Sequence, residues 1–217
     1  MLYEGLVDRV WIVRHGQTRD NMYPKKRLLT VHEYNRIVRG SDVREMTGEG
    51  HRQIAALIDG FRECGFAAVH SSTLPRALKS AEILADGLGV AIVPMEDFRE
   101  FVPTAHEPLF RHRAPRPLRS WFLRSMVRQF LPLYDIEETV YAARGRVVRA
   151  WRALLQWQPP AQDGEEPSRE RLLVSHQGTI MLLLSWLAFD RRWRIVRRDL
   201  HNAGITEVVR KRAGIMA

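Results

Sequence analysis

Two short apolar runs, each followed at once by polar and ionisable residues, dominate the hydrophobic pattern of this 217-residue chain. Residues Val10–Val13 and Leu172–Val174 are rich in large aliphatic and β-branched side chains, which is typical of buried strands. Histidine follows each run, at His15 and His176, and a glycine comes one or two residues later. Because the carboxyl ends of parallel strands border one ligand-binding crevice, the pattern predicts that the two histidines meet there.

The remaining apolar pattern alternates helices with strands. Helices are predicted from an N-cap at Thr47 to about Glu63, from Pro75 to Gly87, from Asp135 to Trp157 and from Thr179 to Phe189. Further strands are predicted at Ala67–His70, Val90–Val93 and Ile205–Arg210, the last at a sheet edge. The alternation indicates an α/β fold: a single-domain three-layer α/β/α sandwich with a mostly parallel central sheet and an antiparallel edge strand. One domain is expected over residues 1–217.

Two segments depart from this pattern. Residues 22–40 form a polar, basic connection whose helical character the pattern leaves open. In the second segment, about residues 101–135, prolines at 108, 115 and 117 precede an apolar stripe at helical spacing, interleaved with arginines. The stripe consists of Leu118, Trp121, Phe122, Met126 and Phe130. We expect a helical insertion that covers the crevice as a lid. An ordinary surface helix and an amphipathic helix that contacts acidic lipid are the alternatives.

Composition is that of an ordinary globular protein, with 45% hydrophobic and 27% charged residues. The single cysteine, Cys64, excludes an internal disulfide and fits a reducing compartment. The first residues, MLYEGLVDR, do not resemble a signal peptide, and the longest apolar run is too short to span a bilayer. We therefore expect a cytoplasmic protein without a transmembrane segment.

A formal net charge of +9 raises the question of nucleic-acid binding. The positive residues are nearly all arginine and are spread over several segments, and no nucleic-acid-binding module is present in the sequence. We interpret the charge first as an electrostatic attraction for anionic substrates, without specific nucleic-acid binding.

Six motifs, in order along the chain, resemble those of the histidine phosphatase superfamily, the group that also contains the cofactor-dependent phosphoglycerate mutases. They are Arg14-His15-Gly16 within RHGQTRDN, TGEGHRQ at 47–53, SSTLPRA at 71–77, Phe98-Arg99-Glu100, Ser175-His176, and NAGIT at 202–206. The set departs from the family pattern at Thr73, where proline is common. RHG alone would be a weak signal, whereas the ordered set spans most of the chain and favours the phosphatase branch.

The resemblance implies roles for residues of this chain. His15 would attack a phosphoryl group and form a phosphohistidine, while Arg14, Arg76 and His176 would surround the transferred oxygens. Glu100 would be the general acid, with Glu96, Asp97 and Glu107 as competitors for that role. Substrate binding would fall to Asn21, Gln17, Gln177 and Thr18. No metal and no cofactor are expected.

The predicted function is hydrolysis of a small anionic phosphorylated metabolite. This substrate is the binding partner that we expect for the protein. A mutase is the first alternative, although the longer mutase-like run after RHG is missing. A non-catalytic relative that binds phosphorylated ligands, and a basic protein that binds nucleic acid or acidic membrane, are the others. The sequence does not determine the oligomeric state, and a homodimer is one of the possibilities.

Overall fold

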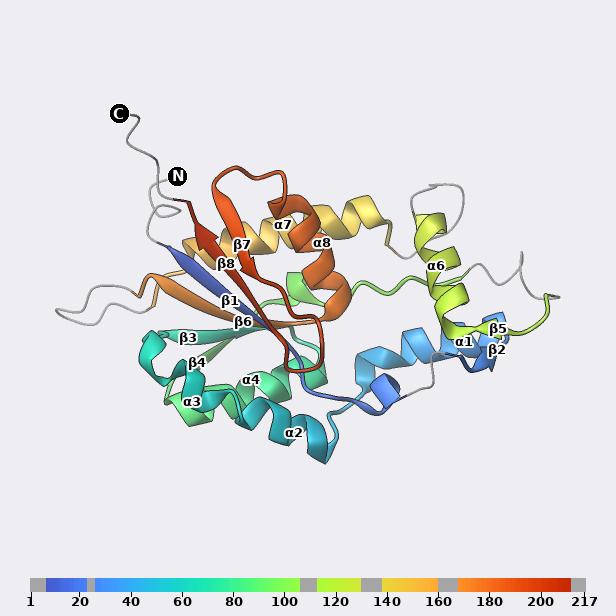
Figure 1. The fold of residues 1–217 in the computed structure, drawn as a ribbon, viewed down its shortest axis with the longest axis horizontal. Helices are drawn as coiled ribbons and strands as arrows, with labels where there is room; N and C mark the ends of the chain where they lie inside the picture. The colour runs from blue at the N-terminus through green and yellow to red at the C-terminus, as the bar shows by residue number, and fades with distance from the viewer. Residues whose placement is uncertain (1–6, 23–25, 106–112, 130–137, 160–167, 212–217) are drawn as a thin grey trace.

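A six-stranded sheet forms the centre of the computed structural model, which describes residues 7–22, 26–105, 113–129, 138–159 and 168–211 (Figure 1). Its strand order is β4-β3-β6-β1-β8-β7. The strands are β1 (Arg9–Arg14), β3 (Ala68–Ser71), β4 (Ala91–Pro94), β6 (Glu170–Ser175), β7 (Trp193–Arg197) and β8 (Ile205–Arg210). The first four run parallel to one another, β8 runs antiparallel to β1, and β7 pairs antiparallel with β8.

The predicted α/β fold class is confirmed, with one correction at the edge of the sheet. Strand β8 was expected to be the last strand, but it lies between β1 and β7. The edge strand is Trp193–Arg197, which the sequence pattern did not reveal because four of its five residues are exposed or half-buried and two of them are arginines. An edge strand buries little of its surface, so its hydrophobic alternation is weak.

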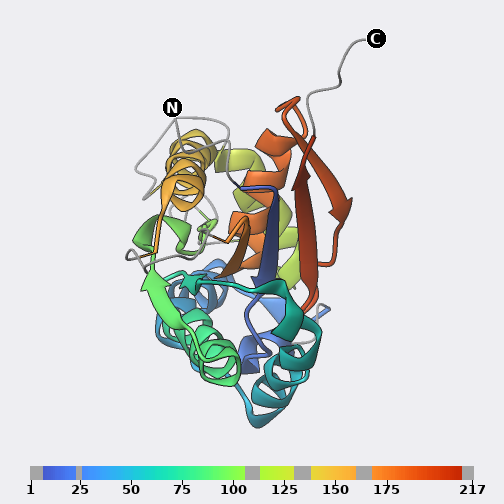
Figure 2. The ribbon, with the colours of Figure 1, turned by 90° about the vertical axis from the view of Figure 1, so that its left-hand side faces the viewer.

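Helices cover both faces of the sheet (Figure 2). On one face lie α7 (Val140–Gln156) and α8 (Gln177–Leu187); on the other lie α2 (Gly48–Ala55), α3 (Ile58–Phe61) and α4 (Pro75–Leu88). Strand β1 contributes to both cores, since Val10 and Ile12 pack with α7 and α8 while Val13 packs with α4. This alternation follows the two-residue period of a strand buried on both faces.

The register of the parallel strands sets the position of the histidines. Arg14, the last residue of β1, pairs with Ser175, the last residue of β6. His15 and His176 therefore both leave the sheet at the same level. Strand β3 is aligned so that Ser71 pairs with Val174, which places the loop after β3 beside them.

Beyond the carboxyl ends of the parallel strands lies a smaller unit, here called the cap and defined as residues 26–39 and 113–129 (Figure 1). It contains β2 (Leu28–Leu29), α1 (Val31–Arg39), β5 (Arg116–Pro117) and α6 (Leu118–Gln129), and β2 pairs antiparallel with β5. The cap has its own apolar core, in which Trp121 stacks on Tyr34 and its indole N–H donates to the Leu29 carbonyl at 2.7 Å.

The predicted helical insertion is therefore partly described: α6 is present, while residues 106–112 and 130–135 lie outside the described residues. Its apolar stripe requires a correction. Trp121 is fully buried, and Leu118 and Met126 are partly buried, but Phe122 is 47% exposed because the inner face of the helix turns toward α1. Phe130 lies outside the described residues.

One predicted helix differs from the structure in its boundaries, and the connection whose helical character the sequence left open contains a helix. The helix predicted over 47–63 is divided into α2, α3 and a short 3-10 turn, and Ile58 at the start of α3 packs onto Gly87 of α4. The connection over 22–40 contains α1, whose N-cap Thr30 forms a capping box with Glu33. The other 3-10 turns are η1 (Arg19–Met22), η2 (Gly40–Val43) and η4 (Glu96–Phe98). Among the described residues, no helix is long and apolar enough to cross a membrane.

Candidate active site

The loop after β1 is held in place by contacts from three directions. The backbone N–H of His15 donates to Ser175 at 3.0 Å, and that of Gly16 donates to the Ser80 hydroxyl at 3.1 Å. Glycine is required at position 16 because an added Cβ would lie 2.5 Å from the Gly50 carbonyl oxygen. The tight approach of α2 to this loop positions the histidine at the strand end.

The His15 ring is buried, and its hydrogen bonds identify the nitrogen that is available for chemistry. Nδ1 lies 2.8 Å from the Gly16 carbonyl oxygen, which can only accept, so Nδ1 carries the proton. The other nitrogen, Nε2, therefore has the free lone pair, toward which Arg76 Nε donates at 3.2 Å. Burial lowers the pKa of His15 well below its ordinary value, and the charges of Arg76 and Arg14 lower it further.

His176 lies against His15, with 5.2 Å between the ring centroids. Its Nε2 is 2.8 Å from the Ser72 hydroxyl, whose oxygen accepts from the Leu74 backbone N–H at 3.3 Å. If the Ser72 hydroxyl donates to Nε2, the neutral ring carries its proton on Nδ1. That nitrogen is 4.0 Å from Glu100 Oε2. Burial and the positive charge of Arg76 hold the pKa of His176 well below its ordinary value.

Two arginines reach the histidines from different elements. Arg76 is buried in the first turn of α4, where Pro75 occupies the start of the helix. Arg14, at the end of β1, donates through Nη1 to the Leu200 carbonyl at 2.7 Å. The pKa of Arg14 is lowered, chiefly by burial. The Glu100 carboxylate opposes this shift, and the positive charge of Arg76 adds to it. These shifts place both guanidinium groups and Glu100 in one electrostatic cluster.

Glu100 is the carboxylate that the fold brings to the histidines. Its side chain is 18% exposed, and Gly178 at the start of α8 makes room for it, since a Cβ there would lie 2.6 Å from Glu100 Oε1. Burial raises the pKa of Glu100, although Arg76 and Arg14 oppose the shift. The segment before it is braced by the buried Arg146, whose Nη1 donates to the carbonyls of Asp97 and Arg99 at 2.7 and 3.1 Å.

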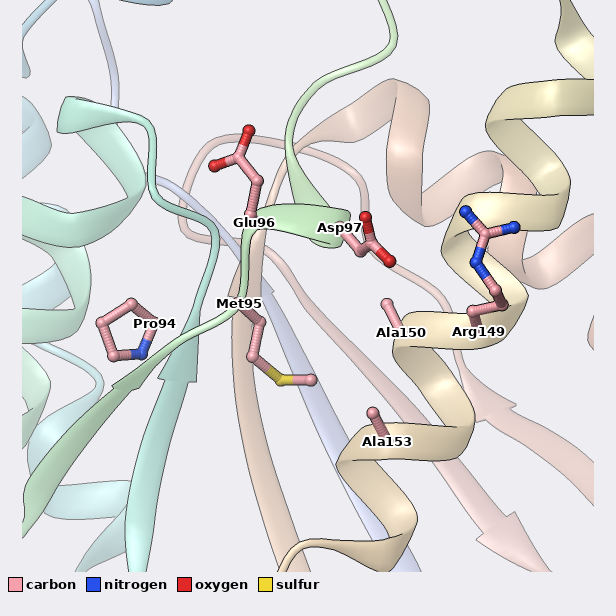
Figure 3. Close-up of a pocket in the computed structure, with 7 residues that line it drawn as sticks. All are labelled: Pro94, Met95, Glu96, Asp97, Arg149, Ala150 and Ala153. Carbon is pink, nitrogen blue, oxygen red and sulfur yellow. The ribbon is translucent and has the colours of Figure 1, made fainter.

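The competing acids lie elsewhere. Glu96 is exposed, accepts from the Thr73 hydroxyl and pairs with Arg99 at 3.5 Å. Glu96 and Asp97 border a groove whose other side is formed by Arg149, Ala150 and Ala153 of α7 (Figure 3). None of the residues that line this groove belongs to the histidine cluster. Glu107 lies outside the described residues.

Of the four residues predicted to bind substrate, three belong to the loop after β1 and the fourth follows His176. Asn21 Oδ1 accepts from the backbone and hydroxyl of the buried Thr18 at 2.9 and 3.0 Å. The Gln17 side chain accepts from Thr47 at 3.1 Å. Gln177 is exposed at the first position of α8. In this arrangement Asn21 and Gln17 brace the loop.

A family model for the histidine phosphatase superfamily (branch 1) matches residues 10–216. The chain belongs to this superfamily. The match covers nearly the whole chain, so the sequence-based prediction of a histidine phosphatase is confirmed.

Solved structures agree on the fold of this histidine phosphatase. A protein called mycobacterial hydrolase 2 is 19% identical, with a TM-score of 0.60 and coverage of 95% of this chain and 84% of that one. A phosphoserine phosphatase variant from Entamoeba histolytica, solved with phosphoserine, is 17% identical, with a TM-score of 0.58 and coverage of 92% and 89%. A mycobacterial glucosyl-3-phosphoglycerate phosphatase is 18% identical, with a TM-score of 0.52 and coverage of 83% and 79%. No curated protein matches the chain in sequence.

Several residues of the site were not assigned a role from the sequence. Ser72 contacts His176, and Ser80 accepts from Gly16 while donating to the Arg76 carbonyl at 2.7 Å. Asn202 donates to Asn21 Oδ1 at 2.9 Å and to the His15 carbonyl at 3.3 Å. Ser72 and Asn202 both fall within the quoted motifs, which is a usable signal. No sequence motif indicated a role for Ser80. Its only sequence clue is its position one helical turn after Arg76.

Proposed function

We propose that this protein hydrolyses small anionic phosphate monoesters through a phosphohistidine formed on His15. The observation that carries the proposal is the hydrogen bond between His15 Nδ1 and the Gly16 carbonyl. It leaves the lone pair on Nε2, on the side where Arg76 and His176 lie. A nitrogen that attacks phosphorus needs this tautomer, and it needs the neutral ring that burial favours.

In the first step, His15 Nε2 forms a bond to phosphorus while the bond between phosphorus and the ester oxygen breaks. Arg14, Arg76 and the Nδ1–H of His176 donate to the phosphoryl oxygens as negative charge develops on them. The Arg76 contact to Nε2 is replaced by a contact to the phosphate in this step. Donors that are already held in place stabilise the transition state without the reorganisation that water would need.

Glu100 supplies the proton that the leaving oxygen takes up. Because burial raises its pKa, a larger fraction of this carboxyl group is protonated near neutral pH than for an exposed glutamate. In the second step a water molecule attacks phosphorus, Glu100 accepts the proton of that water, and the bond between phosphorus and Nε2 breaks. Inorganic phosphate leaves, and both His15 and Glu100 return to their starting protonation states.

The charge of the cap supports an anionic metabolite as the substrate. Residues 26–39 and 113–129 carry nine arginines and lysines and one glutamate, a formal charge of +8 against +9 for the whole chain. The cap that carries this charge lies beyond the carboxyl ends of the parallel strands (Figure 1). A field of this sign raises the local concentration of anions at the crevice. The similar solved proteins named for glucosyl-3-phosphoglycerate and phosphoserine are consistent with such substrates.

The test is to trap the phosphoenzyme. Wild-type protein mixed with radiolabelled p-nitrophenyl phosphate and quenched in alkali should carry acid-labile phosphate on His15. His15→Ala should remain folded by circular dichroism, lose turnover by several orders of magnitude and carry no label. A label that persists in His15→Ala and maps to His176 would overturn the assignment of the nucleophile. Absence of turnover by wild-type protein on a broad panel of phosphate esters would overturn the function itself.

A further inference from the structure

The turn that joins β3 to α4 places a serine hydroxyl beside the ring of His176. The Ser72 backbone N–H donates to the Val174 carbonyl of β6 at 3.0 Å, and the Ser72 carbonyl accepts from the Ser71 hydroxyl at 2.9 Å. Ser72 is fully buried, and its hydroxyl oxygen lies 2.8 Å from His176 Nε2. Because both backbone groups of Ser72 are hydrogen-bonded, the sheet and the turn fix the position of this hydroxyl.

The hydrogen bonds of the Ser72 hydroxyl distinguish the two neutral forms of His176. In either form, the hydroxyl oxygen accepts from the Leu74 backbone N–H at 3.3 Å. If Nε2 carried the ring proton, it would donate to this oxygen, and the hydroxyl hydrogen would need another acceptor. Within the described part of the chain, the hydroxyl makes no other hydrogen bond. If Nδ1 carries the ring proton, the hydroxyl hydrogen is satisfied by the lone pair of Nε2.

The two forms differ in the number of buried groups that they leave unpaired. With the proton on Nε2, both the Ser72 hydroxyl hydrogen and the lone pair of His176 Nδ1 would lack a partner. With the proton on Nδ1, only that N–H lacks one among the described residues. Each unpaired buried polar group costs free energy, so the form with Nδ1 protonated is favoured.

The single unpaired group is a donor that lies among the proposed catalytic residues. Glu100 Oε2 is 4.0 Å from His176 Nδ1, and the centroids of the His176 and His15 rings are 5.2 Å apart. Burial, which lowers the pKa of His176, keeps the ring neutral, so it has one N–H and one lone pair. The lone pair is used by Ser72, and the N–H is available to a phosphoryl oxygen.

We infer that Ser72 is a positioning residue, whose hydroxyl donates to His176 Nε2 and thereby keeps the Nδ1–H of His176 available to the transferred phosphoryl group. The inference deepens the proposed function and rests on it, because the donor acts in that reaction. Ser72 acts through His176 and needs no contact of its own with the substrate. A donor that is held in this way stabilises the transition state without reorganisation.

Nitrogen-15 NMR of the ligand-free protein tests the protonation of the ring directly, because protonated and bare ring nitrogens have well-separated resonances. The signals of His176 are assigned by their absence from the spectrum of His176→Gln. Wild-type protein at neutral pH should have a protonated Nδ1 and a bare Nε2, and a protonated Nε2 would overturn the inference. The measurement needs no turnover. Failure of the proposed function is therefore distinguishable, since wild-type protein would then hydrolyse no phosphate ester.

Ser72→Ala and Ser71→Ala form a matched pair for kinetics. Each variant removes a fully buried serine hydroxyl, but only the first removes the contact with His176. Ser72→Ala should lower kcat for p-nitrophenyl phosphate by about 10–100-fold with little change in KM, since the loss of a transition-state donor outright costs about 10²–10³-fold. Ser71→Ala should retain most of the wild-type kcat. Losses of equal size in the two variants, or an unchanged kcat in Ser72→Ala, would contradict the inference.

The same substitution in a His176→Ala background separates positioning from a general effect on the structure. Groups that act as a unit are non-additive, so Ser72→Ala should cause no further loss of kcat when His176 is already absent. A loss as large as that in wild-type protein would mean that Ser72 only supports the fold, and the inference would be wrong. If Ser72→Ala does not fold, the spectrum of wild-type protein still decides.

Discussion

His70 should make the folded state sensitive to mild acid. It lies on β3, fully buried, with its ring edge-on to Trp157 at 4.8 Å between centroids. Both ring nitrogens are buried, and a contact with the Leu172 backbone opposes the lowering of the pKa. Burial, aided by the positive charge of Arg171, lowers the pKa of His70 from 6.5 to about 4. His70 is thus a packed residue of the predicted strand and lies apart from the histidine cluster.

The direction of the effect follows from proton binding. Between pH 6.5 and pH 4 the unfolded chain binds a proton at this histidine that the folded chain does not, so the stability falls as the pH decreases through this interval. With these two pKa values, the loss of folding free energy that His70 causes is negligible at pH 7 and about 2 kcal/mol at pH 5. A loss of this size is a substantial part of the stability of a typical domain.

Urea denaturation of wild-type protein and His70→Leu at pH 7 and pH 5 measures the effect. Leucine keeps an apolar side chain against Trp157, so the variant should lose about 2 kcal/mol less than wild type on acidification. The buried catalytic histidines contribute equally to both proteins and cancel in the difference. His51→Leu is the control, since its exposed ring is solvated in both states. Equal losses for wild type and His70→Leu would refute the reasoning.

Two further predictions concern the chemistry and the cap. Glu100→Gln should reduce turnover of alkyl phosphates by about 10²–10⁴-fold but that of p-nitrophenyl phosphate far less, because that leaving group needs little protonation; an equal loss on both would assign Glu100 a structural role. Replacing Arg113, Arg116 and Arg119 with glutamine should raise KM for polyanionic substrates severalfold, with little effect on kcat, and the difference should shrink in high salt. Unchanged KM values together with lost binding to acidic vesicles would instead identify a membrane contact.

The sequence predicted the centre of the site because that centre depends on local pattern. An apolar run that ends at a histidine defines a buried strand end, and the parallel arrangement of β1 and β6 then brings His15 and His176 together. Arg76 was singled out only by the resemblance of SSTLPRA at 71–77 to the family motif, and it lies in the first turn of the helix that starts at Pro75. Each of these inferences needs a stretch of only a few residues and the rule that parallel strands share one ligand-binding edge.

The parts that were missed depend on contacts across long separations in sequence. Asn202 reaches the carbonyl of His15 over 187 positions, and no local pattern reports such a contact. The edge strand β7 was hidden by its exposed, arginine-rich sequence. By contrast, the capping box of Thr30 and Glu33 is a local signal for α1 that the basic composition of the surrounding segment obscured.

The cap is tied to the backbone just after the proposed acid. The Tyr34 hydroxyl donates to the Pro103 carbonyl at 2.7 Å, and the Asn35 side chain exchanges two hydrogen bonds of 2.8 Å with the backbone of Ala105. Glu100 is three residues before Pro103. A displacement of α1 would therefore also displace the segment that carries the Glu100 carboxyl group. These hydrogen bonds join the cap to the segment that carries the proposed proton donor. We therefore expect substitutions in the apolar core of the cap to change the dependence of turnover on the leaving group.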